Sequence, residues 1–166
     1  NSDKESIDRL NSYGKKVLFG IPKEQNIRKT DSAQSNTINN ANIMAIMEAG
    51  SVVNNIPARP LFDKVVQKHK EQIDDYFQQI FNALLLDNKE EADKLMEALA
   101  LNIQAWCQSY FTEDNGWKPN APITIHGGWM RKNGKSFYVK GKKSDKPLID
   151  TGELRKSIRG IVVKER

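Results

Sequence analysis

The sequence predicts an α+β fold in which an antiparallel sheet packs against a long helical hairpin. Two amphipathic segments, 60–86 and 88–110, follow each other across a short break. Short apolar runs of the kind that form strands lie before and after this pair. Helices and strands are thus grouped along the chain instead of alternating, which favours α+β over a parallel α/β sheet.

The chain has 166 residues, of which 38% are hydrophobic and 28% are charged. This length suits a single domain, 1–166, and the polar composition indicates exposed segments beside a modest core. The net charge of +5 comes from interspersed Lys, Arg, Asp and Glu, so it is only weak support for nucleic-acid binding. No apolar run approaches the length that spans a bilayer, and we therefore expect no membrane contact.

The N-terminal third should contain two ordered elements between polar segments. Residues 1–13 are polar and predict an exposed helix or arm. The run KKVLFGIP at 15–22 is apolar and ends in breakers, which predicts a strand. Residues 24–40 are rich in Asn, Ser, Thr and Gln and predict a flexible loop. Residues 41–50 favour a helix that ends at a glycine cap, although a strand is an alternative.

The helical hairpin is the strongest prediction. Apolar side chains recur three and four residues apart from Pro60 to Leu86, and Pro60 suits the first turn of a helix. Asn88 and Glu91 have the spacing of a capping box, which predicts the start of a second helix that runs to Tyr110. The short connection implies that the two helices are antiparallel.

The C-terminal part predicts short elements. Between 112 and 147, Gly, Pro and Asn alternate with brief apolar pieces, which indicates two short strands in exposed turns. Asp150 and Glu153 again have capping-box spacing, so a short helix should follow. The run GIVVKE at 160–165 is the final predicted strand.

Motifs for catalysis are absent from the sequence. It contains no phosphate-binding glycine loop, dinucleotide fingerprint, cysteine pair or metalloprotease pattern. We therefore expect no enzyme activity, no catalytic residues, no cofactor and no metal. A hydrolase that uses His126, alone or with Cys107, is an alternative, but a mid-helix cysteine lacks the support that a reactive thiolate needs. Neighbouring carboxylates such as Asp74 and Asp75 diverge on a helix, which favours a solvated face.

A basic and aromatic segment at 129–143 offers an alternative function. Its cations are interleaved with Trp129, Phe137 and Tyr138, as in surfaces that stack bases and contact phosphates. The same pattern suits a β-hairpin arm whose lysines discourage edge pairing. If the chain is a nucleic-acid-binding module, the contact residues are Arg131, Lys132, Lys140, Lys142 and Lys143.

Two further motifs resemble a known family. The first is NIMAIMEAGSVVNNIPARPLF at 42–62 and the second is KPLIDTGELRKSI at 146–158. Together, in this order, they resemble the tail-completion or head–tail joining proteins of long-tailed bacteriophages, the phage virion morphogenesis family. The resemblance covers residues 42–163. It departs from the family pattern at Ala49, where an aromatic residue is frequent, and after Pro60, where Phe usually comes first.

The resemblance implies a structural virion protein that completes the tail end or joins tail to head, without catalysis. Such a subunit would form a homo-oligomeric ring, contact other phage neck and tail proteins, and allow DNA to pass through the ring. It would be found in the virion and, during assembly, in the cytoplasm of the host bacterium, whether the source is an active phage or a prophage. The family pattern carries over to interface positions Glu48, Gly50, Ile56, Pro57, Arg59, Pro60, Asp150, Thr151, Gly152, Leu154 and Ser157.

The residue types of the first motif suggest a role in docking. Pro57 and Pro60 fix the backbone and predict a stiff, extended lead-in that loses little entropy on binding. Arg59 offers a planar donor for a carboxylate across an interface, with Glu48 or Asp150 as its partner. The alternative is that this segment caps the long helix and packs internally. The second motif has the same two readings, a helix start or a direct contact between subunits.

Overall fold

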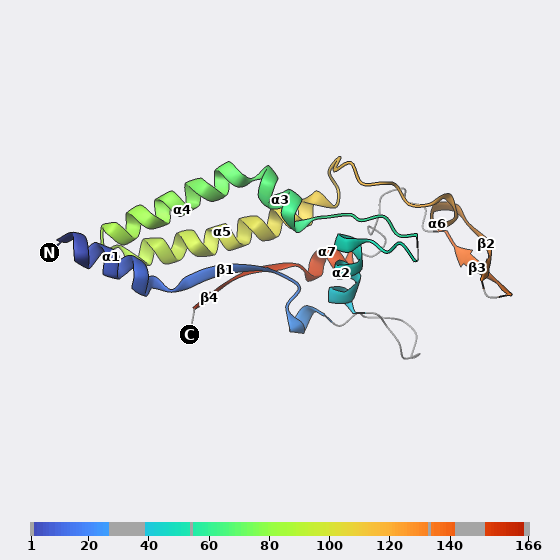
Figure 1. Ribbon diagram of the computed structural model, residues 1–166, viewed down its shortest axis with the longest axis horizontal. Helices are drawn as coiled ribbons and strands as arrows, with labels where there is room; N and C mark the ends of the chain where they lie inside the picture. Colours follow the sequence, from blue (N-terminus) through green and yellow to red (C-terminus); the bar gives the residue numbers. More distant parts are fainter. Residues whose placement is uncertain (1, 27–38, 54, 133, 142–151, 165–166) are drawn as a thin grey trace.

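A computed structural model describes residues 2–26, 39–53, 55–132, 134–141 and 152–164 (Figure 1). The molecule is elongated, with a helical hairpin and a sheet at one end and a small β-hairpin at the other. The predicted class is confirmed, because an antiparallel sheet packs on a long helix pair. The elements in chain order are α1 (Ser2–Tyr13), β1 (Lys15–Gly20), the 3-10 helix η1 (Lys23–Gln25), α2 (Asn40–Ala49), α3 (Phe62–Lys68), α4 (Lys70–Leu85), α5 (Lys89–Tyr110), α6 (Pro122–His126), β2 (Gly127–Lys132), β3 (Lys135–Lys140), α7 (Glu153–Ser157) and β4 (Arg159–Lys164).

The main sheet joins the two ends of the described chain. Strands β1 and β4 pair antiparallel, with Lys15 opposite Lys164 and Gly20 opposite Arg159. The sheet packs on α5, and Gly160 of β4 lies directly against the helix backbone. The backbone N–H of Gly160 also donates to Oε1 of Gln104 at 3.1 Å. The sheet and the helix therefore leave no room for a side chain at position 160.

The helical hairpin forms as predicted in its second half. Asn88 Oδ1 accepts from the Glu91 backbone N–H at 3.1 Å, so the predicted cap starts α5. Side chains between the helices and the sheet form two buried clusters. One lies around α5, α2, α3 and α7 and contains Met44, Met47, Leu61, Val65, Leu99, Ile103, Cys107, Tyr110, Phe111, Leu154 and Ile158. The other lies at the hairpin turn and contains Tyr13, Ile80, Ala83, Leu84, Ala92 and Met96.

The first half of the helical hairpin consists of two helices, α3 and α4, so the prediction of one continuous helix over 60–86 is wrong. The helix is interrupted at His69, whose φ of −108° and ψ of 21° separate α3 from α4. The His69 ring stacks on Trp106 of α5, with parallel planes and centroids 4.1 Å apart. No proline or glycine marks this position, and the stacking on Trp106 is a contact with a residue far away in sequence.

This stacked histidine should make stability depend on pH. Burial lowers the pKa of His69 below its ordinary 6.5, and the nearby charge of Lys68 lowers it further, against an opposing effect of Glu113. The unfolded chain then binds a proton that the folded chain does not, so the contribution of His69 is complete above pH 6.5 and is lost as pH falls below it. We expect the urea midpoint to fall from pH 7 to pH 5, and this fall to be smaller in His69→Gln.

The exposed His126 provides the matched control for that measurement. His126 lies at the end of α6 and its side chain is exposed. His126→Gln should therefore keep the pH dependence of the wild-type protein. An equal fall in the midpoint for wild type and His69→Gln would show that His69 does not cause it.

The N-terminal segment is more firmly attached than an exposed arm. Most of α1 is exposed, but its last residue, Tyr13, is buried in the second cluster. The Tyr13 hydroxyl donates to Asp93 Oδ1 at 2.8 Å, and Lys15 Nζ lies 2.7 Å from the same carboxylate. Arg9 Nη2 donates to the Leu85 carbonyl at 3.1 Å. The C-terminal half of α1 is thus bound to the turn of the helical hairpin.

The flexible loop predicted at 24–40 lies mostly outside the described residues. Its two described ends are bound to each other. The Asn40 backbone N–H donates to the Asn26 carbonyl at 3.0 Å, and Asn26 Oδ1 accepts from the Ala41 N–H at 2.7 Å. Asn26 and Asn40 therefore lie next to each other at the start of α2.

Candidate interface around the two motifs

The structure brings the two motifs into contact. Helix α2, from the first motif, packs against α7, from the second. Met44 and Met47 of α2 share a buried cluster with Leu154 and Ile158. Helices α2 and α7, which are more than a hundred positions apart in the sequence, therefore meet in one buried cluster.

The first motif turns sharply at Gly50. This residue ends α2 with φ +70° and ψ −174°, a conformation that essentially only glycine adopts. A Cβ at Gly50 would lie 2.7 Å from the Ala58 nitrogen and 2.9 Å from the Ile56 carbonyl oxygen. Ser51 and Ile56 exchange two backbone hydrogen bonds of 2.8 Å. The chain therefore leaves α2, forms a closed loop and returns across Gly50.

The tip of this loop exposes two valines. Val52 is 99% exposed and Val53 is 95% exposed. Large apolar side chains so fully exposed and side by side are typical of surfaces that another molecule covers. Sequence reasoning did not place them at an interface, although a β-branched pair between a glycine and two asparagines was the available signal. This Val52–Val53 tip is the most exposed apolar feature of the region.

Glu48 caps a helix instead of pairing with Arg59. Its Oε1 accepts from the backbone N–H groups of Leu61 and Phe62, at 2.8 and 3.0 Å. These are orphan donors at the start of α3, and the carboxylate also suits the positive end of the helix. Within one chain, Glu48 is therefore a cap of α3, and the pair between Arg59 and Glu48 across an interface stays a prediction. Pro60 is not in the first helical turn, because α3 begins at Phe62 with Leu61 as its cap residue.

Arg59 is held within its own chain. Its backbone N–H donates to the Met47 carbonyl at 2.7 Å, and its Nη2 donates to the Lys118 carbonyl at 3.2 Å. Burial lowers the pKa of the guanidinium. Trp117 Nε1 donates to the Pro60 carbonyl at 3.3 Å from the same side. The double-proline segment is thus bonded to α2 on one side and to the chain that follows α5 on the other.

The second motif contributes mainly to the core. Gly152 precedes α7 in a left-handed conformation with φ +63°. Leu154 and Ser157 are each 3% exposed, and Ser157 Oγ donates to the Leu154 carbonyl at 2.6 Å. Both residues are therefore internal, which corrects their prediction as contacts between subunits. Asp150 and Thr151 lie outside the described residues, so the predicted cap and the second proposed partner of Arg59 stay predictions.

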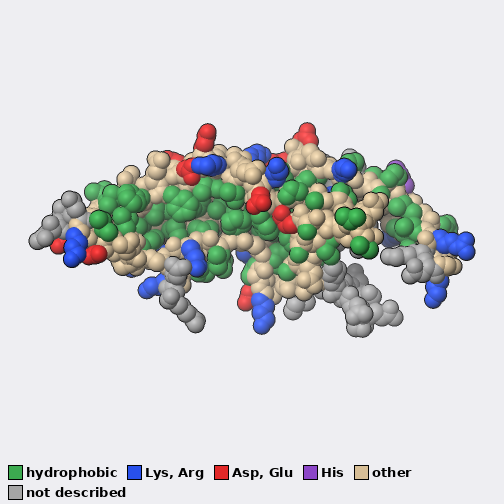
Figure 2. Space-filling model, in the orientation of Figure 1, with side chains coloured by type: hydrophobic (Ala, Val, Ile, Leu, Met, Phe, Trp, Pro, Cys, Tyr) green, Lys and Arg blue, Asp and Glu red, His purple; other side chains and the backbone are tan. Residues whose placement is uncertain are grey.

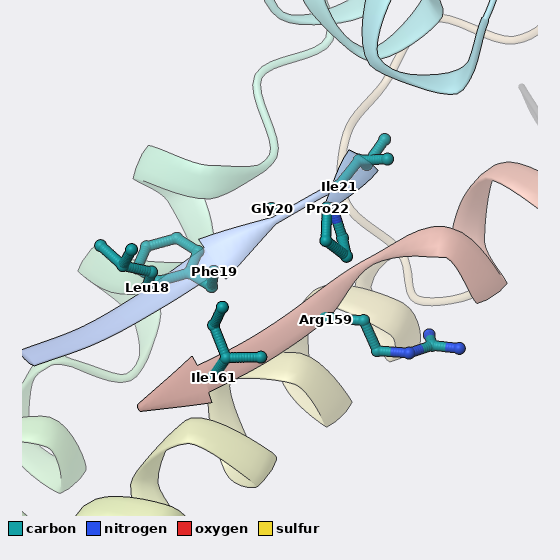
Figure 3. Close-up of a pocket in the computed structure, with 7 residues that line it drawn as sticks. All are labelled: Leu18, Phe19, Gly20, Ile21, Pro22, Arg159 and Ile161. Atoms are coloured by element: carbon teal, nitrogen blue, oxygen red, sulfur yellow. The ribbon is translucent and has the colours of Figure 1, made fainter. Parts of the chain in front are cut away.

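Apolar hollows flank this region on two sides. One lies against α2 and is lined by Ile43, Ile46, Met47, Ile56 and Arg59. The other, of about 200 Å³, lies at the end of the main sheet (Figure 3). Its apolar wall comes from Leu18, Phe19, Ile21, Pro22 and Ile161, and the side chain of Arg159 extends away from Leu18 and Phe19.

The basic segment forms a projecting hairpin. Strands β2 and β3 pair antiparallel and are joined by two residues, the second of which, Gly134, has φ +76° as tight hairpin turns require. Trp129 and Tyr138 are paired across the strands, with ring centroids 5.7 Å apart, and are 72% and 59% exposed. Of the predicted nucleic-acid contacts, Arg131 and Lys140 are exposed on this hairpin, Lys132 is the last residue of β2, and Lys142 and Lys143 lie outside the described residues.

The groups considered for catalysis are not assembled. Cys107 is fully buried, and burial together with the charge of Glu48 raises its thiol pKa to about 12. It is therefore the small buried hydrophobe that was predicted, not a nucleophile. Within the described ranges, no three His, Cys, Asp or Glu side chains are placed to share a metal ion. Among the same residues, no helix has the length and apolar character to cross a bilayer.

No family model, curated protein or solved structure matches this chain. Similarity to characterised proteins therefore contributes nothing to the assignment of function.

Proposed function

We propose that this chain is a structural subunit of a bacteriophage particle that completes the tail end or joins tail to head. It acts as a ring-forming building block without catalysis, and it binds copies of itself and the neck and tail proteins next to it. DNA passes through the ring, and the protein is found in the virion after assembly in the cytoplasm of the host bacterium.

The observation that carries the proposal is the pairing of the two motifs. Residues 42–62 and 146–158 resemble the same family, and the elements formed by their described parts, α2 and α7, pack together in one region. That region presents the Val52–Val53 tip on a loop that the hydrogen bonds between Ser51 and Ile56 close, before the proline-rich segment that follows. A rigid apolar projection suits assembly, because little conformational freedom is lost when it docks.

The proposal is tested by locating the protein on particles. An antibody against the purified chain is applied to particles from the strain that encodes it, and the label is viewed by electron microscopy. We expect label at the junction of head and tail or at the head-proximal tail end. Intact particles that contain none of the protein would contradict the proposal.

The Val52–Val53 tip gives a sharper version of this test. Because both side chains are almost fully exposed, Val52→Asp with Val53→Asp should change the free energy of unfolding by no more than about 0.5 kcal/mol. The same variant should be incorporated into particles at least about tenfold less, because two charges would be buried in an apolar contact.

Val52→Thr with Val53→Thr keeps the shape of the tip and serves as the control. Incorporation and stability are measured on the same preparations, by quantitative blotting of purified particles and by urea unfolding. Normal incorporation of the aspartate variant would show that the tip is not a docking surface.

A further inference from the structure

Charge is distributed unevenly along the chain. Residues 115–144 contain seven of the 26 Lys and Arg and none of the 21 Asp and Glu. Residues 71–97, which cover nearly all of α4 and the first part of α5, contain eight carboxylates and two lysines. The basic segment includes the β2–β3 hairpin and the acidic one includes the turn of the helical hairpin, and these lie at opposite ends of the molecule (Figure 1).

The β2–β3 hairpin is an arm with little support from the body. Its strands pack on each other and on α6, and among the described residues they make no extensive contact with the helical hairpin or the main sheet. Both of its faces carry exposed apolar side chains. Trp129 and Tyr138 form one pair across the strands, and Met130 and Phe137, 39% and 42% exposed, form the next.

Helix α4 has a complementary surface. Phe77 and Phe81 are each 49% exposed and line a shallow hollow together with Asp74, Gln78 and Asn82. Apolar side chains gather over this half of the molecule in the space-filling view, and Lys or Arg side chains project from the opposite tip as well as from other places along the surface (Figure 2). Asp74, which lines the hollow, and its neighbour in sequence Asp75 are both exposed.

We propose that the β2–β3 arm of one copy docks on the α4 hollow of a second copy, head to tail. Aromatic side chains of the arm would cover Phe77 and Phe81, and Arg131 would face the carboxylate of Asp74. A contact within one copy is excluded by the distance between the two ends of the molecule. The inference rests on the proposed ring-forming function and names the contact that forms the ring.

A second copy fits these observations better than nucleic acid. Nucleic acid could pair its phosphates with the cations of the arm and stack its bases on the aromatic rings. It would leave the two half-exposed phenylalanines of α4 uncovered. Association through two different patches is heterologous, and it closes into a ring when the rotation between copies permits. Opposite charges at the two ends also fix the orientation in which copies meet.

Cysteine cross-linking tests the contact directly. One preparation carries Tyr138→Cys on the arm and another carries Gln78→Cys on α4, both at exposed positions. The native Cys107 is buried and does not compete. After mixing and mild oxidation, we expect a disulfide-linked pair that contains one chain of each kind. The control replaces Gln78→Cys by Ala105→Cys, an exposed position on α5 outside the hollow, and should give little product.

A charge exchange provides a second, independent test of the contact. Arg131→Glu should weaken self-association on the order of tenfold at low salt, and adding Asp74→Arg to the same chain should restore it. Loss of the exposed ion pair between Lys70 and Asp74 costs little by itself. Lys64→Glu, an exposed change of equal charge on α3, should leave association unchanged.

The outcomes separate this inference from the proposed function. Rings that form normally with Arg131→Glu, or equal cross-linking in the control pair, would overturn the docking inference alone. Loss of duplex-DNA binding by Arg131→Glu with self-association intact would also overturn it, and would assign the arm to nucleic acid. Absence of the protein from particles would instead overturn the proposed function.

Discussion

Gly160→Val is expected to destabilise the protein by at least about 3 kcal/mol. A Cβ at Gly160 would lie 2.0 Å from the Ala100 carbonyl oxygen and 2.8 Å from its carbonyl carbon. Both are atoms of the α5 backbone, so no side-chain rotation relieves the clash. Strand β4 would have to move away from α5, which would also break the bond from the Gly160 N–H to Gln104.

Urea unfolding followed by circular dichroism measures this effect. Since small domains are stable by only about 5–15 kcal/mol, the variant should lose a large fraction of its stability, and its urea midpoint should fall clearly. Ile161→Val is the matched control, because that side chain is 44% exposed on the other face of the same strand. A Gly160→Val protein as stable as this control would show that β4 does not lie against α5 as described.

Glu48→Ala is expected to cost about 2–3 kcal/mol, because it leaves two backbone donors without their charged acceptor. The Leu61 and Phe62 N–H groups both depend on this carboxylate, and Leu61 is fully buried. The loss should appear at the start of α3 and in the double-proline segment before it. Amide hydrogen exchange at Leu61 and Phe62 should become faster, together with a lower urea midpoint.

Two further variants show whether the lost stability comes from the missing hydrogen-bond acceptor or from the loss of a negative charge near α3. Glu48→Gln keeps an acceptor oxygen and should lose clearly less stability than Glu48→Ala. Asp63→Ala removes an exposed carboxylate from the first turn of α3 and should cost no more than about 1 kcal/mol. Equal stability of Glu48→Ala and wild type would contradict the role of Glu48 as the cap of α3.

Elements with strong local signals were predictable. The strands at 15–20 and 159–164, the helix that ends at Gly50 and the Asn88 cap all follow from hydrophobic pattern and turn chemistry within a few residues. The hairpin partner of each long helix followed from their short connection. These predictions succeed because neighbouring residues alone determine them.

Features that depend on distant contacts were missed. The helix break at His69 coincides with stacking on Trp106, 37 positions later in the sequence. The backbone N–H of Leu61, the cap residue of α3, bonds to Glu48, 13 residues earlier. Distant contacts also decide the positions of the residues that were expected at an interface, and these residues differ in what they do. Leu154 and Ser157 are internal, Glu48 is a cap, and Arg59 bonds to Lys118 of its own chain.

The exposed apolar features of the candidate interface also lay beyond sequence reasoning. A valine pair within an apolar-rich motif reads equally well as core, and only the hydrogen bonds between Ser51 and Ile56 show that it forms a tip. Likewise, Phe77 and Phe81 lie in the apolar stripe of a helix, but the packing of α4 leaves half of each ring exposed.

The central claim, that this chain is a ring-forming subunit, is tested most directly by its mass in solution across a concentration series. Light scattering should show growth from the 18.9 kDa monomer to one fixed multiple, which then stays constant as concentration rises further. A mass that remains that of the monomer at every concentration, with or without the neck and tail proteins of the same particle, would contradict the account.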